Sequence, residues 1–232
     1  MSFNTKKYHL VRATLSKELS NFIFNYMMLQ RDAVGWMLEH NKVNRFNPLI
    51  GTRGDIQIPR AYSKYADWVM ETLLMYMIPI MKAKTGMELV PTYSYTRLYE
   101  KGNVLDRHKD RNSCEVSATL HLGGDEWPIF IDETGTDNIL IGKDSVQSFK
   151  TNNLLPRYSR QPVVLRPGAP KGTKITLKVG DMLLYSGCEL EHWREPFQGN
   201  VCSQAFLHYN HANGPFAKTN LFDKRLMLGL PK

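Results

Sequence analysis

The chain has 232 residues, of which 42% are hydrophobic and 22% are charged, and its formal net charge is +8 at pH 7. This length fits one domain, and the apolar share is sufficient for a sizeable core. Three cysteines without a Cys-x-x-Cys pair argue against a disulfide framework and a structural zinc site, and they favour a reducing compartment.

The first part of the chain predicts helices that support a later core. Residues 15–39 carry apolar side chains near helical spacing, and Ser16 is a candidate N-cap. Residues 40–62 are rich in asparagine and glycine and predict a loop. We expect the apolar face of the helix to pack against the outside of a sheet.

A second helix is predicted over residues 63–84, with Gly86 as its C-terminal stop. Pro79 should kink this helix or end it early, because proline lacks a backbone N–H. The longest apolar run, residues 73–81, contains this proline and is too short to cross a bilayer. Since the N-terminus also lacks an apolar signal core, we expect a soluble, cytoplasmic protein.

From residue 93 onward the pattern changes to short strands separated by turn residues. Aromatic, β-branched and alternating apolar residues form short segments, and glycine or asparagine breaks separate several of them. The predicted strands cover residues 93–99, 115–122, 181–185, 191–194 and 202–209. Many short strands with turns between them indicate an antiparallel sandwich or barrel.

Residues 143–172 interrupt this series of strands. The segment is rich in serine, proline and glycine, and it predicts an insertion with short β pieces at 163–165 and 174–177. Long loops of this kind are often functional, so we hypothesise that the insertion borders a substrate entrance. From Asn210 onward we expect a surface excursion.

A His-x-Asp motif is the strongest chemical signal in the chain. His108 and Asp110 are two residues apart, so on a strand their side chains point to the same face. If a later strand places His192 beside them, the three form a 2-His-1-carboxylate triad, which suits non-haem Fe(II) with open positions for other ligands. The alternative is a solvated turn, because residues 106–111 are dense in charge.

Over about residues 90–212 the chain resembles the core of the Fe(II)/2-oxoglutarate-dependent dioxygenases, most closely the prolyl 4-hydroxylase-like group. The motifs that carry the resemblance are Tyr99-Glu100-Lys101-Gly102, His108-Lys109-Asp110, Ser117-Ala118-Thr119-Leu120-His121-Leu122, Gly180-Asp181 and His192. The resemblance implies an α+β fold in which a double-stranded β-helix (jelly roll) forms the core. The expected single domain, 1–232, divides into a helical region at about 1–88, the core at about 89–212 and an extension at 213–232.

The resemblance also implies roles for individual residues. His108, Asp110 and His192 match the iron ligands, with 2-oxoglutarate as co-substrate and O₂ as oxidant, and no further side chain is needed as a general acid or base. Tyr99 matches a tyrosine that contacts 2-oxoglutarate, but a core aromatic residue is an equal alternative. His121 stands where many relatives have a tyrosine near the co-substrate, which leaves its role open.

The cation that would anchor 2-oxoglutarate is missing from its expected place. The prolyl hydroxylase pattern has a lysine or arginine about ten residues after the second histidine, and residues 200–204 contain neither. Arg194 is the first substitute, because it is two residues after His192 and a continuing strand would point both inward. Arg97, two residues before Tyr99, is the second. Either arginine could instead form an internal ion pair.

Three functions are compatible with these observations. The first is hydroxylation of a C–H bond in a peptide, for example at proline, or in a small molecule. The second is oxidative dealkylation of nucleic acid, which only the basic residues between 157 and 174 support. The third is a non-enzymatic jelly roll that binds a metal. A solvated basic face is the plainer interpretation of the positive charge, so nucleic acid is the weaker candidate partner.

Overall fold

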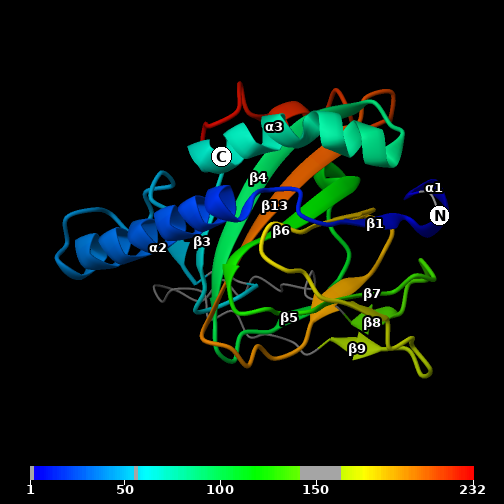
Figure 1. Cartoon of the computed structure of the whole chain (residues 1–232), viewed down its shortest axis with the longest axis horizontal. Helices are drawn as coiled ribbons and strands as arrows, with labels where there is room; N and C mark the ends of the chain where they lie inside the picture. Colours follow the sequence, from blue (N-terminus) through cyan, green and yellow to red (C-terminus); the bar gives the residue numbers. More distant parts are fainter. Residues whose placement is uncertain (1–2, 55–56, 142–162) are drawn as a thin grey trace, which may run out of the picture.

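The computed structural model describes residues 3–54, 57–141 and 163–232. Within these residues two antiparallel sheets face one another, and two long helices cover the outer side of the larger sheet (Figure 1). This α+β arrangement is consistent with a jelly-roll core. In the described part of the chain, no helix is long and apolar enough to span a membrane.

The larger sheet has seven strands in the described residues, and the smaller sheet has four. In spatial order the larger sheet contains β1 (Tyr8–Val11), β11 (Met182–Tyr185), β6 (Val116–Gly124), β13 (Val201–His211), β4 (Leu89–Glu100), β3 (Tyr62–Tyr65) and β2 (Thr52–Arg53). The smaller sheet contains β10 (Thr173–Ile175), β7 (Ile129–Ile131), β12 (His192–Arg194) and β5 (Leu105–His108). The remaining elements are α1 (Phe3–Lys6), α2 (Lys17–Glu39), α3 (Trp68–Thr85), the hairpin of β8 (Ile139–Ile141) with β9 (Val164–Leu165), and the 3₁₀ turns η1 (Asn112–Cys114) and η2 (Leu221–Lys224).

Side-chain caps determine where the two long helices begin. Ser16 caps α2, as predicted, by accepting a hydrogen bond from the backbone N–H of Leu19 at 3.2 Å. Helix α3 begins later than predicted, because residues 62–65 pair with β4 as strand β3 and Asp67 then caps the helix. Gly86 ends α3 in the left-handed conformation, with φ of 71°.

Pro79 does not end α3, which continues to Thr85. The prediction of an early end was therefore wrong. Pro79 lies on the exposed side of the helix together with Met75 and Tyr76. On that side, water can solvate the backbone carbonyl that proline leaves without a partner.

Alternation along the central strands separates the main core from the space between the sheets. One set of side chains from β6 and β13 packs against α2 and α3, including Ala118, Leu120 and Leu207. The alternate side chains point toward the smaller sheet, and they include polar residues such as Ser117 and His208. A polar inner face therefore lies beside an apolar outer face on the same strands.

Most of the predicted insertion, 143–172, lies outside the described residues, and so do its basic residues Arg157 and Arg160. The described end, residues 163–172, contains β9, and β10 follows directly after it; both strands lie near the two short β pieces that the sequence predicts. The hypothesis that this segment borders a substrate entrance therefore stays a hypothesis.

The segment after β13 was expected to be a surface excursion, but buried side-chain contacts attach it to the rest of the protein. Asp223 is fully buried and accepts hydrogen bonds from Arg111, at 2.5 and 2.7 Å, and from Tyr65 at 2.7 Å. The buried Arg225 pairs with the buried Glu71 at 3.0 Å. The positive φ of Asp223, 57°, is unusual for a residue with a side chain, and these contacts hold it in place.

We predict that Asp223→Asn weakens the fold mainly above pH 4. Burial would raise the pKa of Asp223, but hydrogen bonds from Arg111 and Tyr65 hold it well below its usual range. Because the unfolded pKa is about 3.9, the carboxylate stabilises the fold above that pH, and the effect fades as the pH falls toward the folded pKa. Urea unfolding should show a loss of about 1–3 kcal/mol at pH 7 that shrinks below pH 4.

Glu88→Gln is the matched control for this experiment. Glu88 pairs with Lys82 on the surface and its side chain is 67% exposed. Exposed pairs contribute about 0–1 kcal/mol, so this variant should remain close to the wild type at both pH values. An Asp223→Asn loss that does not depend on pH would contradict the assigned role of the carboxylate.

Candidate metal centre and the buried arginine beside it

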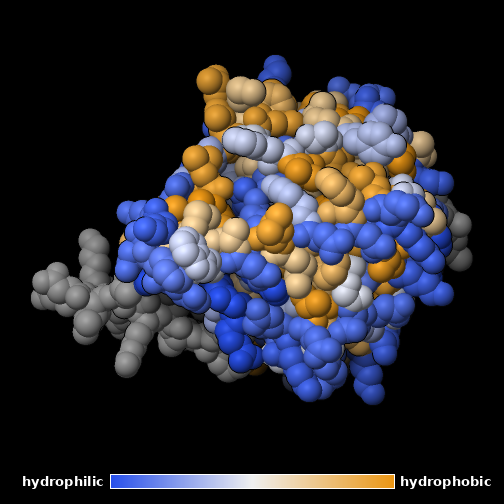
Figure 2. Space-filling model, turned by 60° about the vertical axis from the view of Figure 1, so that its left-hand side comes forward, coloured by the Kyte–Doolittle hydropathy of each residue, from blue (hydrophilic) through white to orange (hydrophobic). Residues whose placement is uncertain are grey.

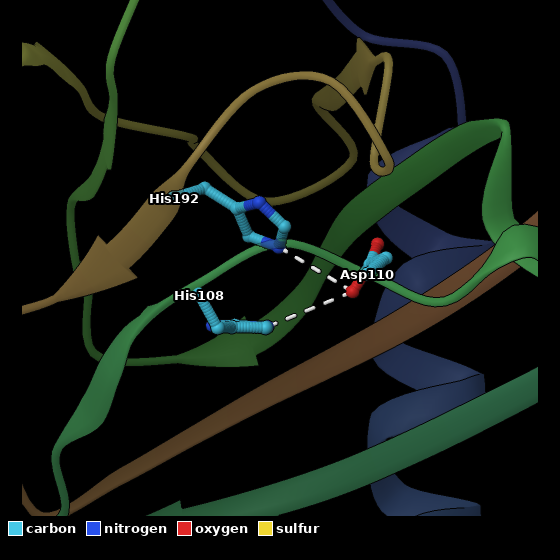
Figure 3. A group of neighbouring side chains, drawn as sticks. All are labelled: His108, Asp110 and His192. Carbon is cyan, nitrogen blue, oxygen red and sulfur yellow. Dashed lines mark ion pairs between the residues drawn. The ribbon is translucent and has the colours of Figure 1, made fainter. Parts of the chain in front are cut away.

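Strands β5 and β12 lie next to each other and place two histidines side by side, with their ring centroids 4.3 Å apart. His108 is the register partner of His192, and Asp110 follows two residues after His108. The Nε2 atoms of both histidines lie 3.6 Å from Oδ1 of Asp110, as Figure 3 shows. The structure thus brings together the three residues that the sequence predicts as metal ligands. Their role as ligands stays a prediction.

Hydrogen bonds fix the tautomer of both imidazoles. Nδ1 of His108 donates to the backbone carbonyl of Asp106 at 2.7 Å, and Nδ1 of His192 donates to that of Leu190 at 3.0 Å. A carbonyl can only accept, so the proton is on Nδ1 and the lone pair is on Nε2. Metal-binding histidines are oriented in this way. The side-chain amide of Gln57 is 3.5 Å from Nε2 of His108 and would have to yield to an ion.

Burial and neighbouring charges shift the pKa values of His108 and Asp110 toward the protonation states that a cation requires. The side chains of His192, Asp110 and His108 are 2%, 16% and 22% exposed. Burial lowers the pKa of His108, and repulsion from His192 lowers it further. Burial alone would raise the pKa of Asp110, but His192 and His108 hold it well below its usual range. A neutral imidazole and a carboxylate suit a divalent ion.

The carboxylate of Asp110 is held from two sides. Its backbone N–H donates to the carbonyl of Gly187 at 2.8 Å, and Ser117 Oγ donates to its Oδ2 at 3.1 Å. A Cβ at Gly187 would lie 2.6 Å from the carbonyl oxygen of Cys114 and would also overlap Oδ2 of Asp110. Only glycine permits this approach. The sequence shows Gly187 as a turn residue and gives no sign of this contact.

A second cluster shares Asp110 but is occupied by its own hydrogen bonds. Asp110, Cys114 and His208 have potential ligand atoms within 4.8 Å of one another. Ser117 Oγ bonds both Asp110 and Nδ1 of His208, the latter at 2.9 Å. Burial raises the pKa of the Cys114 thiol well above its ordinary value, so the sulfur stays protonated. This cluster therefore acts as a support for Asp110.

The residue before each histidine takes part in an ion cluster on the opposite face of the smaller sheet. Arg107 Nε donates to Glu191 at 2.7 Å, and its Nη2 pairs with Asp132 of the segment after β7. The Arg107 guanidinium also lies 4.3 Å from the ring of Trp193. All three charged side chains of this cluster are buried. The cluster links β5, β12 and the end of β7 directly behind the metal centre.

Arg194 lies inside the molecule, two residues after His192 on β12. Its side chain is fully buried, and Nη1 donates to the backbone carbonyl of Trp127. The Nε and Nη2 atoms have no hydrogen-bond partner among the described residues. An unsatisfied buried guanidinium is costly, so this geometry favours an incoming anion.

Aromatic side chains connect Arg194 to the metal centre. The ring of Tyr185 lies 4.7 Å from that of His192. Burial raises the pKa of Tyr185, Asp110 raises it further and Arg194 opposes the rise, so the phenol is influenced by both charged groups. Tyr99 packs edge-on against Trp127, with the ring centroids 4.7 Å apart. The surroundings of Arg194 are therefore largely aromatic.

The other two predicted contacts also face the space between the sheets. His121 is buried, and its Nδ1 accepts from the Gln204 amide at 3.0 Å. Burial, followed by repulsion from Arg194, lowers the pKa of His121 to about 4, so its ring is neutral at pH 7. Arg97 stacks over Tyr95 at 4.9 Å and borders Tyr99 at 6.0 Å. The roles of both residues stay predictions.

No family model matches the sequence, and no curated protein does either. Solved structures do resemble the fold. A prolyl-4-hydroxylase from Pseudomonas putida aligns with a TM-score of 0.51 and 13% identity, over 89% of this chain and 94% of that chain. HygX from Streptomyces hygroscopicus, solved with nickel and 2-oxoglutarate, gives 0.53 and 13%, over 91% and 85%.

SnoK, described as a non-heme alpha ketoglutarate dependent carbocyclase from nogalamycin biosynthesis, aligns with a TM-score of 0.54 and 14% identity. The alignment covers 99% of this chain and 90% of SnoK. At such low identities these likenesses show a shared fold, which is the fold of 2-oxoglutarate-dependent oxygenases.

We predict that Gly187→Ala weakens divalent metal binding at least tenfold. The added methyl group would overlap the carboxylate of Asp110 and the carbonyl of Cys114, so one of them must move. Disturbing the support of a ligand typically costs about 10–100-fold in affinity. Anaerobic calorimetry with Fe(II) measures the change.

Gly35→Ala provides the control, because its new methyl group would lie 3.8 Å from the nearest atom, which is an ordinary contact. If Gly187→Ala binds Fe(II) as tightly as the wild type, the tight contact at Gly187 does not position Asp110.

Proposed function

We propose that the chain is an Fe(II)/2-oxoglutarate-dependent dioxygenase with a double-stranded β-helix core. One observation carries the proposal: three potential metal ligands lie together, and on the same strand as one of them, two residues further on, a buried arginine has unsatisfied nitrogen atoms among the described residues. The Nε2 atoms of His108 and His192 lie 3.6 Å from Asp110, and Arg194 has two nitrogen atoms without a partner in the described residues. The shared fold with 2-oxoglutarate oxygenases supports the same reading.

In this proposal His108, Asp110 and His192 hold the iron. Two neutral imidazoles and one carboxylate leave coordination positions open for other ligands. The bound iron, 2-oxoglutarate and O₂ would supply the oxidising chemistry, in which 2-oxoglutarate loses CO₂ to give succinate while a C–H bond is hydroxylated. The side chains of this protein then have to place the ligands and keep water out.

Arg194 is the proposed anchor for the distal carboxylate of 2-oxoglutarate. A guanidinium can hold a carboxylate through two charge-assisted hydrogen bonds, and Nε and Nη2 form an edge of the required shape. Tyr99 and His121 would line the same pocket, and Arg97 remains the second candidate for the anchor. The surroundings of Arg194 are buried and aromatic, which would strengthen the pairing with an anion.

The proposed substrate class is broad. A peptide, with proline as one option, or a small molecule is supported by solved neighbours that include a prolyl-4-hydroxylase and HygX bound to hygromycin B. We also propose a cytoplasmic location, which three free cysteines support. Dealkylation of nucleic acid is the weaker alternative, because only the basic residues between 157 and 174 support it and a solvated basic face also accounts for them.

Anaerobic Fe(II) titration with and without 2-oxoglutarate, followed by admission of O₂, tests the function. We expect iron to bind, 2-oxoglutarate to change the visible spectrum, and succinate to form slowly without substrate. His192→Ala and His108→Ala should lose iron retention and turnover, because each removes one of three protein ligands.

His40→Ala, on the exposed end of α2, should behave as the wild type. Iron binding that does not respond to 2-oxoglutarate would instead support a metal-binding jelly roll without this activity.

Arg194→Leu should raise the 2-oxoglutarate concentration needed for half-maximal succinate formation by roughly 10- to 100-fold, as expected for the loss of charged hydrogen bonds. Fe(II) affinity should change little, since Arg194 is not a ligand. Arg97→Leu serves as the comparison. If Arg97→Leu raises the requirement and Arg194→Leu does not, Arg97 is the anchor.

A further inference from the structure

Helix α2 carries apolar side chains on two faces. The first face packs on the large sheet and includes Ile23, Met27 and Val34, which are all buried. The second face points away from the sheet. There Phe22, Leu29 and Trp36 are 68%, 70% and 53% exposed. One face is sufficient to attach a helix to its core, so the second apolar face has no role in the fold.

The exposed face follows a regular spacing. Phe22, Leu29 and Trp36 are seven residues apart, and residues 19, 26, 33 and 40 alternate with them at steps of three and four. The exposed members, which we call the outer seam, are Leu19, Phe22, Leu29, Ala33, Trp36 and His40. This 3-4 spacing is typical of helices that pack lengthwise against another helix. The seam is about 31 Å long at 1.5 Å per residue.

Figure 1 shows α2 at the margin of the molecule, with its C-terminal end directed away from the sheets. Figure 2 turns this side forward and shows apolar side chains mixed with polar ones over its surface. The location leaves room for a second helix beside α2.

An acidic row runs along one edge of the outer seam. Three of its four positions are acidic, Glu18, Asp32 and Glu39, and the neutral Asn25 occupies the fourth; all four are exposed, and each precedes a 3-4 position by one residue. Asp32 pairs with its neighbour Arg31 at 2.8 Å, while its side chain remains 64% exposed. This row is negative on a chain whose net charge is +8. Its charge would attract a basic partner and repel an acidic one.

We propose that the outer seam binds a basic amphipathic helix of another protein. The apolar side of that helix would cover Phe22, Leu29 and Trp36, and its lysine or arginine residues would face the acidic row. A second copy of this chain fits less well, because antiparallel pairing of two α2 helices would place the two acidic rows against each other. The proposal does not depend on the proposed function.

Two synthetic helical peptides test the proposal. Both carry leucine at 3-4 spacing, and one has lysine and the other glutamate at the flanking positions. Fluorescence anisotropy with the full chain should show at least tenfold tighter binding of the lysine peptide, and this preference should weaken at high salt. Sedimentation should show that the chain alone is a monomer.

Variants locate the binding site. Leu29→Ser should weaken binding of the lysine peptide at least tenfold. Glu39→Lys should make the affinity for the lysine peptide less sensitive to salt. Asn21→Ser, an exposed polar position on the same helix, is the matched control and should bind as the wild type. Thermal unfolding should be similar for all variants, because each position is exposed.

Three outcomes would overturn the proposal. Equal binding of the two peptides would show that the acidic row does not select the partner. An unchanged affinity in Leu29→Ser would place the binding elsewhere. A dimer in sedimentation that Leu29→Ser dissociates would assign the outer seam to a second copy of the chain.

Discussion

The ion cluster of Arg107, Glu191 and Asp132 is the contact on which the candidate site depends. Residues alternate between the two faces of a strand, so fixing Arg107 and Glu191 on one face fixes the two following histidines on the other. A slip of one residue would turn the imidazoles outward and leave three charges buried without partners. Removing one member of a buried pair costs about 3–5 kcal/mol, which is a large part of the stability of a domain.

The inner space has the opposite electrostatic character. Behind the histidines the charges are paired, whereas the guanidinium of Arg194 on the inside has two nitrogen atoms without a partner among the described residues. Both Asp110 and Arg194 influence the pKa of Tyr185. In the proposed function, a cation beside Asp110 and an anion beside Arg194 would complete the charge balance. The outer charge cluster would then be structural and the inner groups would bind ligands.

Local patterns predicted the parts of the structure that depend on local physics. The Ser16 cap follows from the local sequence, and the burial of both His192 and Arg194, two residues apart on β12, agrees with the alternation expected for a strand. The sequence could not show that Asp223 closes on Arg111, because 112 residues separate the two. The contact at Gly187 is equally hidden, since a turn glycine looks the same whether or not a carboxylate lies against it. Contacts between residues far apart in the chain determine these features, and such contacts produce no periodic pattern in the sequence.

The distance along the chain between interacting residues has a consequence for the order of folding. Arg107 and Glu191 are 84 residues apart, and Arg111 and Asp223 are 112 apart. Contacts of this kind close large loops and form slowly compared with helices. His192 cannot join His108 until the register of β5 and β12 is set. Binding of the proposed metal ion would therefore be a late event, because a chain that has formed only α2 and α3 has not yet brought the three proposed ligands together.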